Sequence, residues 1–139
     1  MEINIQRKND AVLLEATNAS GNSIQIDGAE KIGGTNAGPR PMELVLMGLG
    51  GCSSMDVLSI LKKKRVTLDD FKVNIQAERK ENEIPAVFEK IHLNFQFKGE
   101  SITEDSVKQA VELSMKKYCS VTKMLEKTAD ITYSITIEN

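Results

Sequence analysis

The segment from Pro41 to about Lys64 constrains the fold more than any other part of this chain. Pro41 suits the first position of a helix, Glu43 suits the first turn, and the basic residues 62–65 suit the C-terminal end. The first half of this predicted helix is apolar on nearly every face, so one small sheet can cover only one of its sides. We therefore expect a second copy of the chain to cover it, as a homodimer. A monomer in which two later helices complete the cover is the alternative.

Strand patterns precede and follow this helix. Alternating apolar residues predict three short N-terminal strands near residues 3–5, 12–16 and 24–26, and longer strands at 71–77, 91–97 and 131–137. The glycine- and proline-rich residues 33–41 predict an irregular loop. A second helix is expected after Thr103, and Ser120 is expected to cap a third. The stripe of the second helix consists of Val107, Ala110, Val111, Ser114 and Tyr118.

The resulting order, β-β-β-α-β-β-α-α-β, lacks the regular alternation of strand and helix that builds a parallel fold. It predicts an α+β chain with one-sided antiparallel sheets. With 139 residues, of which 40% are hydrophobic, we expect a single domain over residues 1–139.

Charge and hydropathy narrow the classes of function. The net charge is −2 and the lysines are scattered, so we expect no nucleic-acid partner. Residues 1–10 have no secretion-signal pattern, and the uncharged stretch Leu44–Met55 is too short to cross a bilayer. We expect a soluble, cytoplasmic protein without a membrane partner.

Cys52 and Cys119 are the candidate reactive residues, because two cysteines without a secretion signal are either reduced core residues or redox groups. Cys52 follows Gly50-Gly51, a pair that lets another backbone or a ligand approach the sulfur closely, at about 1 kcal/mol of helix propensity each. Cys119 follows two lysines at the expected start of a helix, and both features favour a thiolate. For each cysteine, a buried inert thiol is the alternative.

Other chemistries fit the chain less well. A peroxidase needs one thiol that attacks a peroxide and a second that condenses with the sulfenic acid, and two distant cysteines suffice if the fold brings them together. The sequence has no Cys-x-x-Cys, and a structural zinc site would need ligands that it lacks. The only histidine, His92, is out of phase with the apolar residues of its strand, which predicts a solvent-facing side chain and no Cys-His dyad. Methionines around the helices predict core filler or a flexible apolar pocket near Cys52.

The chain resembles the OsmC/Ohr family, and within it the YhfA-like branch. The resemblance rests on PMELVLMGLGGCSSMDVLSILKK, on KYCSV around Cys119, and on the element order over nearly the whole chain. It implies an intertwined homodimer with curved sheets around central helices and active sites at the subunit interface. It also implies that Cys52 is the peroxidatic cysteine and Cys119 the resolving one, without cofactor or metal. The implied substrate is an organic or fatty-acid hydroperoxide, and the implied reductant is a dithiol such as a lipoyl group.

Two positions depart from the family pattern. The family glutamate lies ten residues before the first cysteine, where this chain has Met42, while Glu43 stands nine before Cys52. One residue corresponds to about 100° around a helix, so Glu43 is either a catalytic residue or a first-turn acid favoured by the helix dipole. The family also supplies an activating arginine from its N-terminal strands. Residues 10–27 contain no arginine here, which leaves Arg7 and Arg40, and neither lies in a matching motif.

The leading hypothesis is therefore a two-cysteine thiol peroxidase that acts on organic hydroperoxides in oxidative-stress defence. The alternative is a non-catalytic dimeric binding protein that holds an apolar small molecule and has inert or redox-responsive thiols. The spacing of the two sulfur atoms and the charges around them discriminate between these hypotheses.

Overall fold

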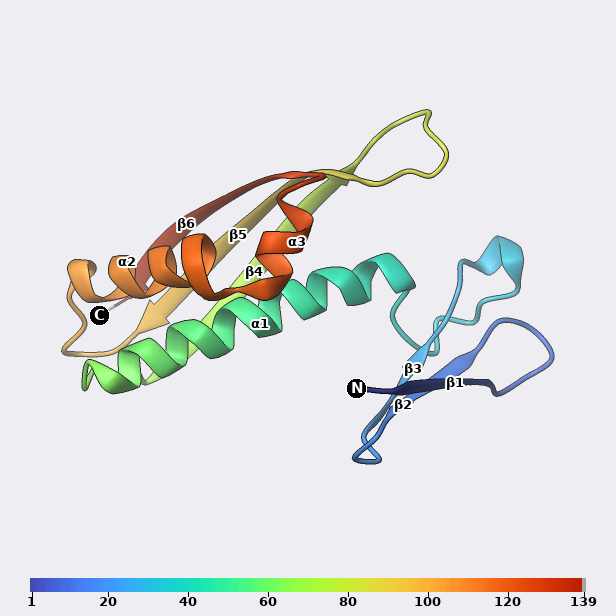
Figure 1. The fold of residues 1–139 in the computed structure, drawn as a ribbon, viewed down its shortest axis with the longest axis horizontal. Helices are drawn as coiled ribbons and strands as arrows, with labels where there is room; N and C mark the ends of the chain where they lie inside the picture. The colour runs from blue at the N-terminus through green and yellow to red at the C-terminus, as the bar shows by residue number, and fades with distance from the viewer. Residues whose placement is uncertain (139) are drawn as a thin grey trace. The chain divides into compact units, whose positions relative to one another are not determined.

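The computed structural model describes residues 1–138 and confirms the α+β class and the predicted order of strands and helices (Figure 1). Two short turns are added, a 3-10 turn at Glu30–Ile32 and a π-helical turn, η2, at Ser114–Tyr118. The chain divides into two compact units, residues 1–47 and the part from residue 48 onward. Helix α1, Pro41–Lys63, begins in the first unit and ends in the second, and a single domain over residues 1–139 stays a prediction.

The first unit contains sheet A, an antiparallel meander of β1, Ile3–Arg7, β2, Leu14–Asn18, and β3, Ser23–Ile26. The loop that follows β3 is organised by Asp27, which is only 2% exposed. Its carboxylate accepts hydrogen bonds from the backbone N–H groups of Gly28, Thr35 and Ala37 at 2.8 to 3.1 Å. These bonds lower the pKa of Asp27. The irregular segment before α1 is thus a fixed loop built on one carboxylate.

The second unit contains sheet B, with β5, Phe88–Lys98, between β4, Asp70–Arg79, and β6, Asp130–Glu138. Alternate residues of β5, from Ile91 to Phe97, are buried, so this sheet has one inner face as predicted. Helix α2, Glu104–Leu113, and the C-terminal part of α1 lie on that face (Figure 1). Thr103 caps α2 by accepting the Ser106 N–H, as the sequence predicts.

One feature of sheet B corrects the prediction of purely antiparallel sheets, because β5 and β6 pair in parallel. The chain between them forms α2, the turn η2 and α3, Ser120–Leu125. This helical connection is long enough to return the chain to the end of the sheet at which β5 began, which a parallel neighbour requires. The antiparallel prediction holds for β4 with β5 and for all of sheet A.

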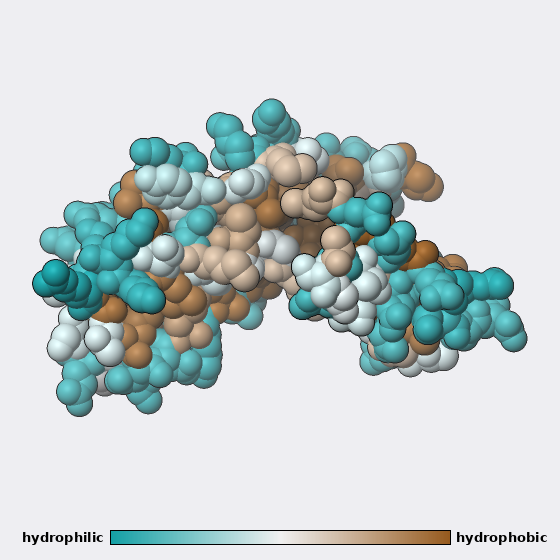
Figure 2. Space-filling view, turned by 60° about the horizontal axis from the view of Figure 1, so that its bottom comes forward, coloured by the Kyte–Doolittle hydropathy of each residue, from teal (hydrophilic) through white to brown (hydrophobic). Residues whose placement is uncertain are grey.

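Helix α1 buries a single narrow stripe, consisting of Leu49, Ser53, Val57 and Leu61. Its spacing of four residues follows one side of the helix. The opposite side remains apolar but uncovered: Met47, Met55 and Leu58 are 56%, 73% and 41% exposed. By length and composition alone, α1 would also qualify as a membrane-spanning helix, a property that it shares with core helices of soluble proteins. Figure 2 shows apolar side chains at the surface among the charged ones.

Candidate functional site: two thiols and a carboxylate

Cys52 lies in α1 next to the buried stripe and is partly exposed. Of the two glycines before it, Gly50 is explained by packing, because a Cβ at this position would lie 2.9 Å from Cδ1 of Ile75 on β4. A Cβ on Gly51 would meet nothing within 4 Å. The close approach of β4 therefore accounts for one glycine, whereas the other lies on the uncovered side of the helix.

Cys119 is placed by the π-helical turn that ends the second helical stretch. Its backbone N–H donates to the carbonyl of Ser114, five residues earlier, at 2.8 Å. A π turn accommodates one residue more than an α-helical turn does, so it rotates the residues that follow. Cys119 is consequently turned inward, at 3% exposed, while Tyr118 is 50% exposed. The prediction that Tyr118 continues the buried stripe of α2 is thus wrong, because Cys119 takes the inward position.

Cys119 is also the N-cap of α3, so the prediction that Ser120 caps this helix is wrong. Its Sγ accepts a hydrogen bond from the Thr122 N–H at 3.4 Å, and Ser120 is the first helical residue. The two preceding lysines are exposed, and Nζ of Lys117 lies 5.2 Å from the centre of the Tyr118 ring. The expected helix N-terminus is therefore present, but the lysines face solvent.

The fold brings both cysteines together with Asp56. The two sulfur atoms and a carboxylate oxygen of Asp56 all lie within 4.8 Å of one another. Asp56 is one helical turn after Cys52, and its Oδ2 lies 3.1 Å from the Oγ of Ser114, which can donate to it. The same hydroxyl lies 3.2 Å from the carbonyl of Ser53. We refer to Cys52, Asp56 and Cys119 as the cysteine cluster.

The electrostatics of the cysteine cluster disfavour a thiolate at Cys119. Burial raises the pKa of the Cys119 thiol above its ordinary value of 9.0, and the neighbouring Cys52 raises it further. The hydrogen bonds with Thr122 act in the opposite direction but are outweighed. Among residues 1–138, no ion pair involves Asp56, and no cation contributes to the pKa shift of Cys119. The prediction that Lys116 and Lys117 promote ionisation is therefore not met.

The remaining predicted residues belong to the first unit. Glu43 belongs to the first unit, where its carboxylate accepts the backbone N–H of Arg40 at 2.9 Å. This is the contact of a capping-box glutamate at the third helical position. Arg7 ends β1, also in the first unit. A catalytic role of Glu43 and an activating role of either arginine stay predictions.

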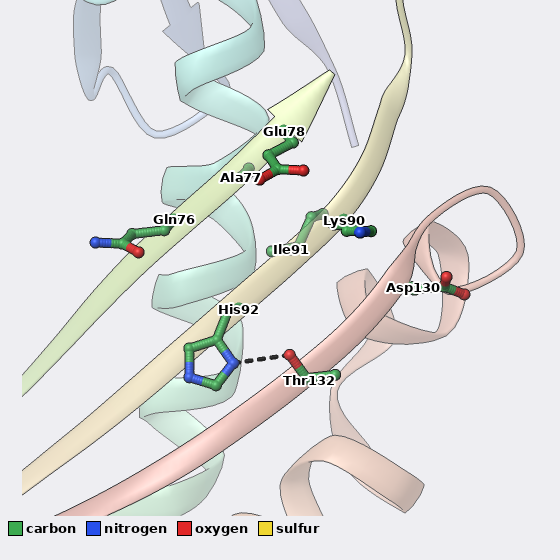
Figure 3. Close-up of a pocket in the computed structure, with 8 residues that line it drawn as sticks. All are labelled: Gln76, Ala77, Glu78, Lys90, Ile91, His92, Asp130 and Thr132. Atoms are coloured by element: carbon green, nitrogen blue, oxygen red, sulfur yellow. Dashed lines mark hydrogen bonds between the residues drawn. The ribbon is translucent and has the colours of Figure 1, made fainter. Parts of the chain in front are cut away.

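His92 lies on the outer face of sheet B, opposite the helices, as predicted (Figure 3). Its two ring nitrogens lie 2.7 Å from the hydroxyl of Thr132 and 2.9 Å from that of Ser134. It borders an open depression of about 580 Å³ that is lined mainly by polar side chains such as Gln76 and Asp130. Neither cysteine lines this depression, so it is separate from the cysteine cluster.

Sequence reasoning missed Asp56 and Ser114 as parts of the site. The signal for Asp56 is its spacing of four residues from Cys52, which puts both side chains on one side of the helix. Ser114 fits the apolar stripe of α2, so its position alone gives no such signal. Its contact with α1 joins residues 58 positions apart, and no local pattern reveals such a pairing.

Comparisons with known proteins agree with this architecture. A family model described as OsmC-like protein matches residues 34–134. Protein YhfA of Escherichia coli strain K12 is 47% identical over 116 residues, which are 84% of this chain and 83% of that protein. A hypothetical protein from Aquifex aeolicus has a solved structure with 31% identity, a TM-score of 0.80, and coverage of 99% of this chain and 97% of that one. A Legionella pneumophila structure, described as an organic hydroperoxide resistance protein, shares the fold at 11% identity, with a TM-score of 0.71 and coverage of 97% and 95%.

Proposed function

This chain belongs to the OsmC-like protein family, and from this premise we propose that it reduces organic hydroperoxides through the thiols of Cys52 and Cys119. The observation that carries the proposal is the separation of the two sulfur atoms, which lie within 4.8 Å of each other although the two cysteines are 67 positions apart in the sequence. The description of the Legionella relative as an organic hydroperoxide resistance protein supports the choice of substrate class. A cytoplasmic location, where thiols are kept reduced, goes with this proposal.

The different environments of the two sulfurs support the division of roles that the resemblance implies. Cys52 is partly exposed, so a peroxide can reach its sulfur. Cys119 is buried and its pKa is raised, so it is the poorer first nucleophile. We assign the attack on peroxide to Cys52 and the resolving step to Cys119.

The reaction balances with these two groups and one external reductant. The Cys52 thiolate attacks the distal oxygen of the hydroperoxide, the O–O bond breaks, and the alkoxide takes up a proton to leave as an alcohol. The resulting sulfenic acid is attacked by Cys119, which forms a disulfide and releases water. A dithiol of the lipoyl type then exchanges with the disulfide, regenerates both thiols and leaves as its own disulfide.

Stopped-flow consumption of cumene hydroperoxide by the reduced, chelator-treated protein tests the proposal. We expect a rate well above that of free cysteine and mass spectrometry that shows a loss of two hydrogens at the 52/119 pair. Cys119→Ser should stop at a sulfenic acid on Cys52 that dimedone traps, because the resolving thiol is absent. Cys52→Ser should abolish the reaction. A wild-type rate no greater than that of free cysteine, or an unaffected Cys52→Ser variant, would refute the assignment.

The role of Glu43 can be separated from its capping contact by Glu43→Gln. Glutamine can still accept the Arg40 N–H through its amide oxygen, so the helix end is retained while the charge is lost. A catalytic carboxylate predicts a fall in kcat/KM with little change in thermal stability. An unchanged kcat/KM would assign Glu43 to the helix end alone. Arg7→Ala and Arg40→Ala, measured in the same assay, test which arginine promotes ionisation.

We further propose a homodimer that covers the exposed side of α1. Met47, Met55 and Leu58 lie along this side with the open Gly51 between them. Contiguous exposed apolar surface of this kind is typical of association sites. Light scattering after size exclusion should give twice the mass of one chain, and Met55→Lys should reduce it to one. Met124→Lys, which changes a methionine on α3 that is equally exposed at 72%, is the control and should leave the mass unchanged. A monomeric wild type would contradict the proposal.

One observation favours the alternative of a non-catalytic binding protein for an apolar small molecule. The pKa of Cys119 is raised, and no cation among the described residues contributes to that shift, so the groups around the Cys119 thiol do not activate it. This alternative predicts no hydroperoxide turnover together with saturable binding of a fatty acid or alkyl probe. Turnover that requires Cys52 would exclude it.

A further inference from the structure

The cysteine cluster combines two thiols with a carboxylate, a set of potential metal ligands that a pair of thiols alone does not offer. Two sulfurs and one carboxylate oxygen converge from two elements, with Cys52 and Asp56 on α1 and Cys119 at the start of α3. All three side chains are buried or partly buried. Thiolates together with a carboxylate are ligands that zinc accepts, whereas magnesium and calcium prefer oxygen ligands alone.

The spacing of the three donors suits a small cation. Donors in a tetrahedral zinc site lie about 2.0–2.3 Å from the metal, so neighbouring donors are about 3.3–3.8 Å apart. The present separations are at most 4.8 Å, and rotation about the short side chains of cysteine and aspartate can reduce them. The three donors would leave a fourth coordination position open for water or an external ligand. This differs from a closed structural zinc site, for which the sequence lacks the four ligands.

The groups around the cluster already orient two of the three donors. The Ser114 hydroxyl can donate to Oδ2 of Asp56, which leaves Oδ1 available. The backbone N–H of Thr122 donates to the Cys119 sulfur. Hydrogen bonds of this kind fix ligand orientation in metal sites. In addition, Asp56 has no cationic partner among residues 1–138, so the carboxylate is free to bind a metal.

We propose that Cys52, Asp56 and Cys119 form an open, three-ligand site for Zn²⁺. Binding replaces the two thiol protons, so each zinc ion that enters releases up to two protons to solvent. A zinc-bound pair of thiolates cannot form a disulfide. Zinc therefore protects the pair from oxidation and blocks peroxide reduction, a consequence that rests on the proposed peroxidase function, whereas the binding itself does not.

The test uses the full chain, reduced and freed of metal by a chelator that is then removed. Titration with Co²⁺ should give a thiolate-to-cobalt charge-transfer band that saturates at one equivalent, and Zn²⁺ should displace it and release protons into a weakly buffered indicator. Cys52→Ser and Cys119→Ser should each abolish the band. Asp56→Asn, which keeps the shape of the side chain, should weaken Zn²⁺ binding, and Ser114→Ala should weaken it about 10- to 100-fold. Asp10→Asn, an exposed aspartate in the first unit, is the control and should bind as the wild type does.

Two results would overturn the inference: no charge-transfer band in the wild type, or Asp56→Asn binding Zn²⁺ as tightly as Asp10→Asn does. Circular dichroism of each variant shows whether it is folded, and the isosteric Asp56→Asn remains informative if a cysteine variant is not. The outcomes for the two proposals are distinguishable. If the protein does not reduce hydroperoxides but binds one Zn²⁺, the zinc proposal stands and the peroxidase proposal falls. If it reduces hydroperoxides but binds no Zn²⁺, only the zinc proposal falls.

Discussion

The close approach of Ile75 to Gly50 allows a quantitative test of how tightly α1 packs against sheet B next to Cys52. Gly50→Ala raises helix propensity, which by itself stabilises by about 1 kcal/mol. The added methyl group, however, would lie 2.9 Å from Cδ1 of Ile75, whereas carbon atoms pack best at about 3.5–4.0 Å. Overpacking of this kind costs about 1–3 kcal/mol. We therefore expect Gly50→Ala to be neutral or destabilising by up to about 2 kcal/mol.

The partner substitution Ile75→Val removes the atom with which the methyl group collides. Alone it should cost at most about 0.5–1.5 kcal/mol, the cost of deleting one buried methyl group, because Ile75 is only partly buried. In the Gly50→Ala background the new methyl group occupies the vacated space, so the same substitution should become neutral or stabilising. The double-mutant cycle should thus yield a coupling energy of about 1–3 kcal/mol that favours the double variant.

Urea unfolding followed by circular dichroism, at one protein concentration and with the thiols reduced, measures the four free energies of unfolding. Fixed concentration is needed because association would otherwise change the apparent stability. Additivity of the two substitutions within about 0.5 kcal/mol would refute the overpacking, because it would show that the end of the Ile75 side chain moves aside at little cost.

Three further outcomes follow from burial and charge. In chelated protein, Cys119 should react with iodoacetamide only at higher pH than free cysteine does, and Cys52→Ser should lower the pH at which it reacts. Because the pKa of Cys119 is raised in the folded state, the protonated thiol contributes its full stabilisation below pH 9.0. This stabilisation is lost as the pH rises through the folded pKa, which alkaline unfolding measures. Asp27→Asn should speed hydrogen exchange of the loop amides that donate hydrogen bonds to this carboxylate. Because the pKa of Asp27 is lowered in the folded state, acid should release the loop as the pH falls below the ordinary pKa of 3.8. Phe95→Ala should cost about 3–5 kcal/mol of unfolding free energy by urea denaturation, whereas Met124→Ala on the surface should stay within about 0.5 kcal/mol.

Local patterns predicted the elements of this chain well because their causes are local. Pro41 begins α1 and Thr103 caps α2, and both follow from the preferences of single residues at helix starts. The alternation along β5 likewise predicted its buried face. The meeting of Cys52 and Cys119 was expected only through the family resemblance, since no spacing rule joins residues so far apart.

The errors lie where one element depends on another. The parallel pairing of β6 with β5 depends on the path of the helical connection, which residue periodicity does not determine. The π turn at the end of α2 shifts the helical register by one residue, so Tyr118 and Cys119 exchange inner and outer positions. A regular period of 3.6 residues could not indicate that shift. The inclusion of Asp56 in the site likewise depends on a contact between elements, that of α1 with Ser114.

The lack of positive charge at the cysteine cluster connects the peroxidase and the zinc proposals. Asp56 is partly buried beside two thiols, and among residues 1–138 no ion pair compensates its charge. A positive partner would stabilise a thiolate formed there, and either a bound metal ion or a second copy of the chain can supply that charge. These sources predict different kinetics. If a second copy supplies the charge, peroxide reduction should fall on dilution below the dimerisation constant, and zinc should inhibit it. If a bound metal supplied the charge, chelation would abolish peroxide reduction. The two-cysteine mechanism instead requires that chelated protein remain active.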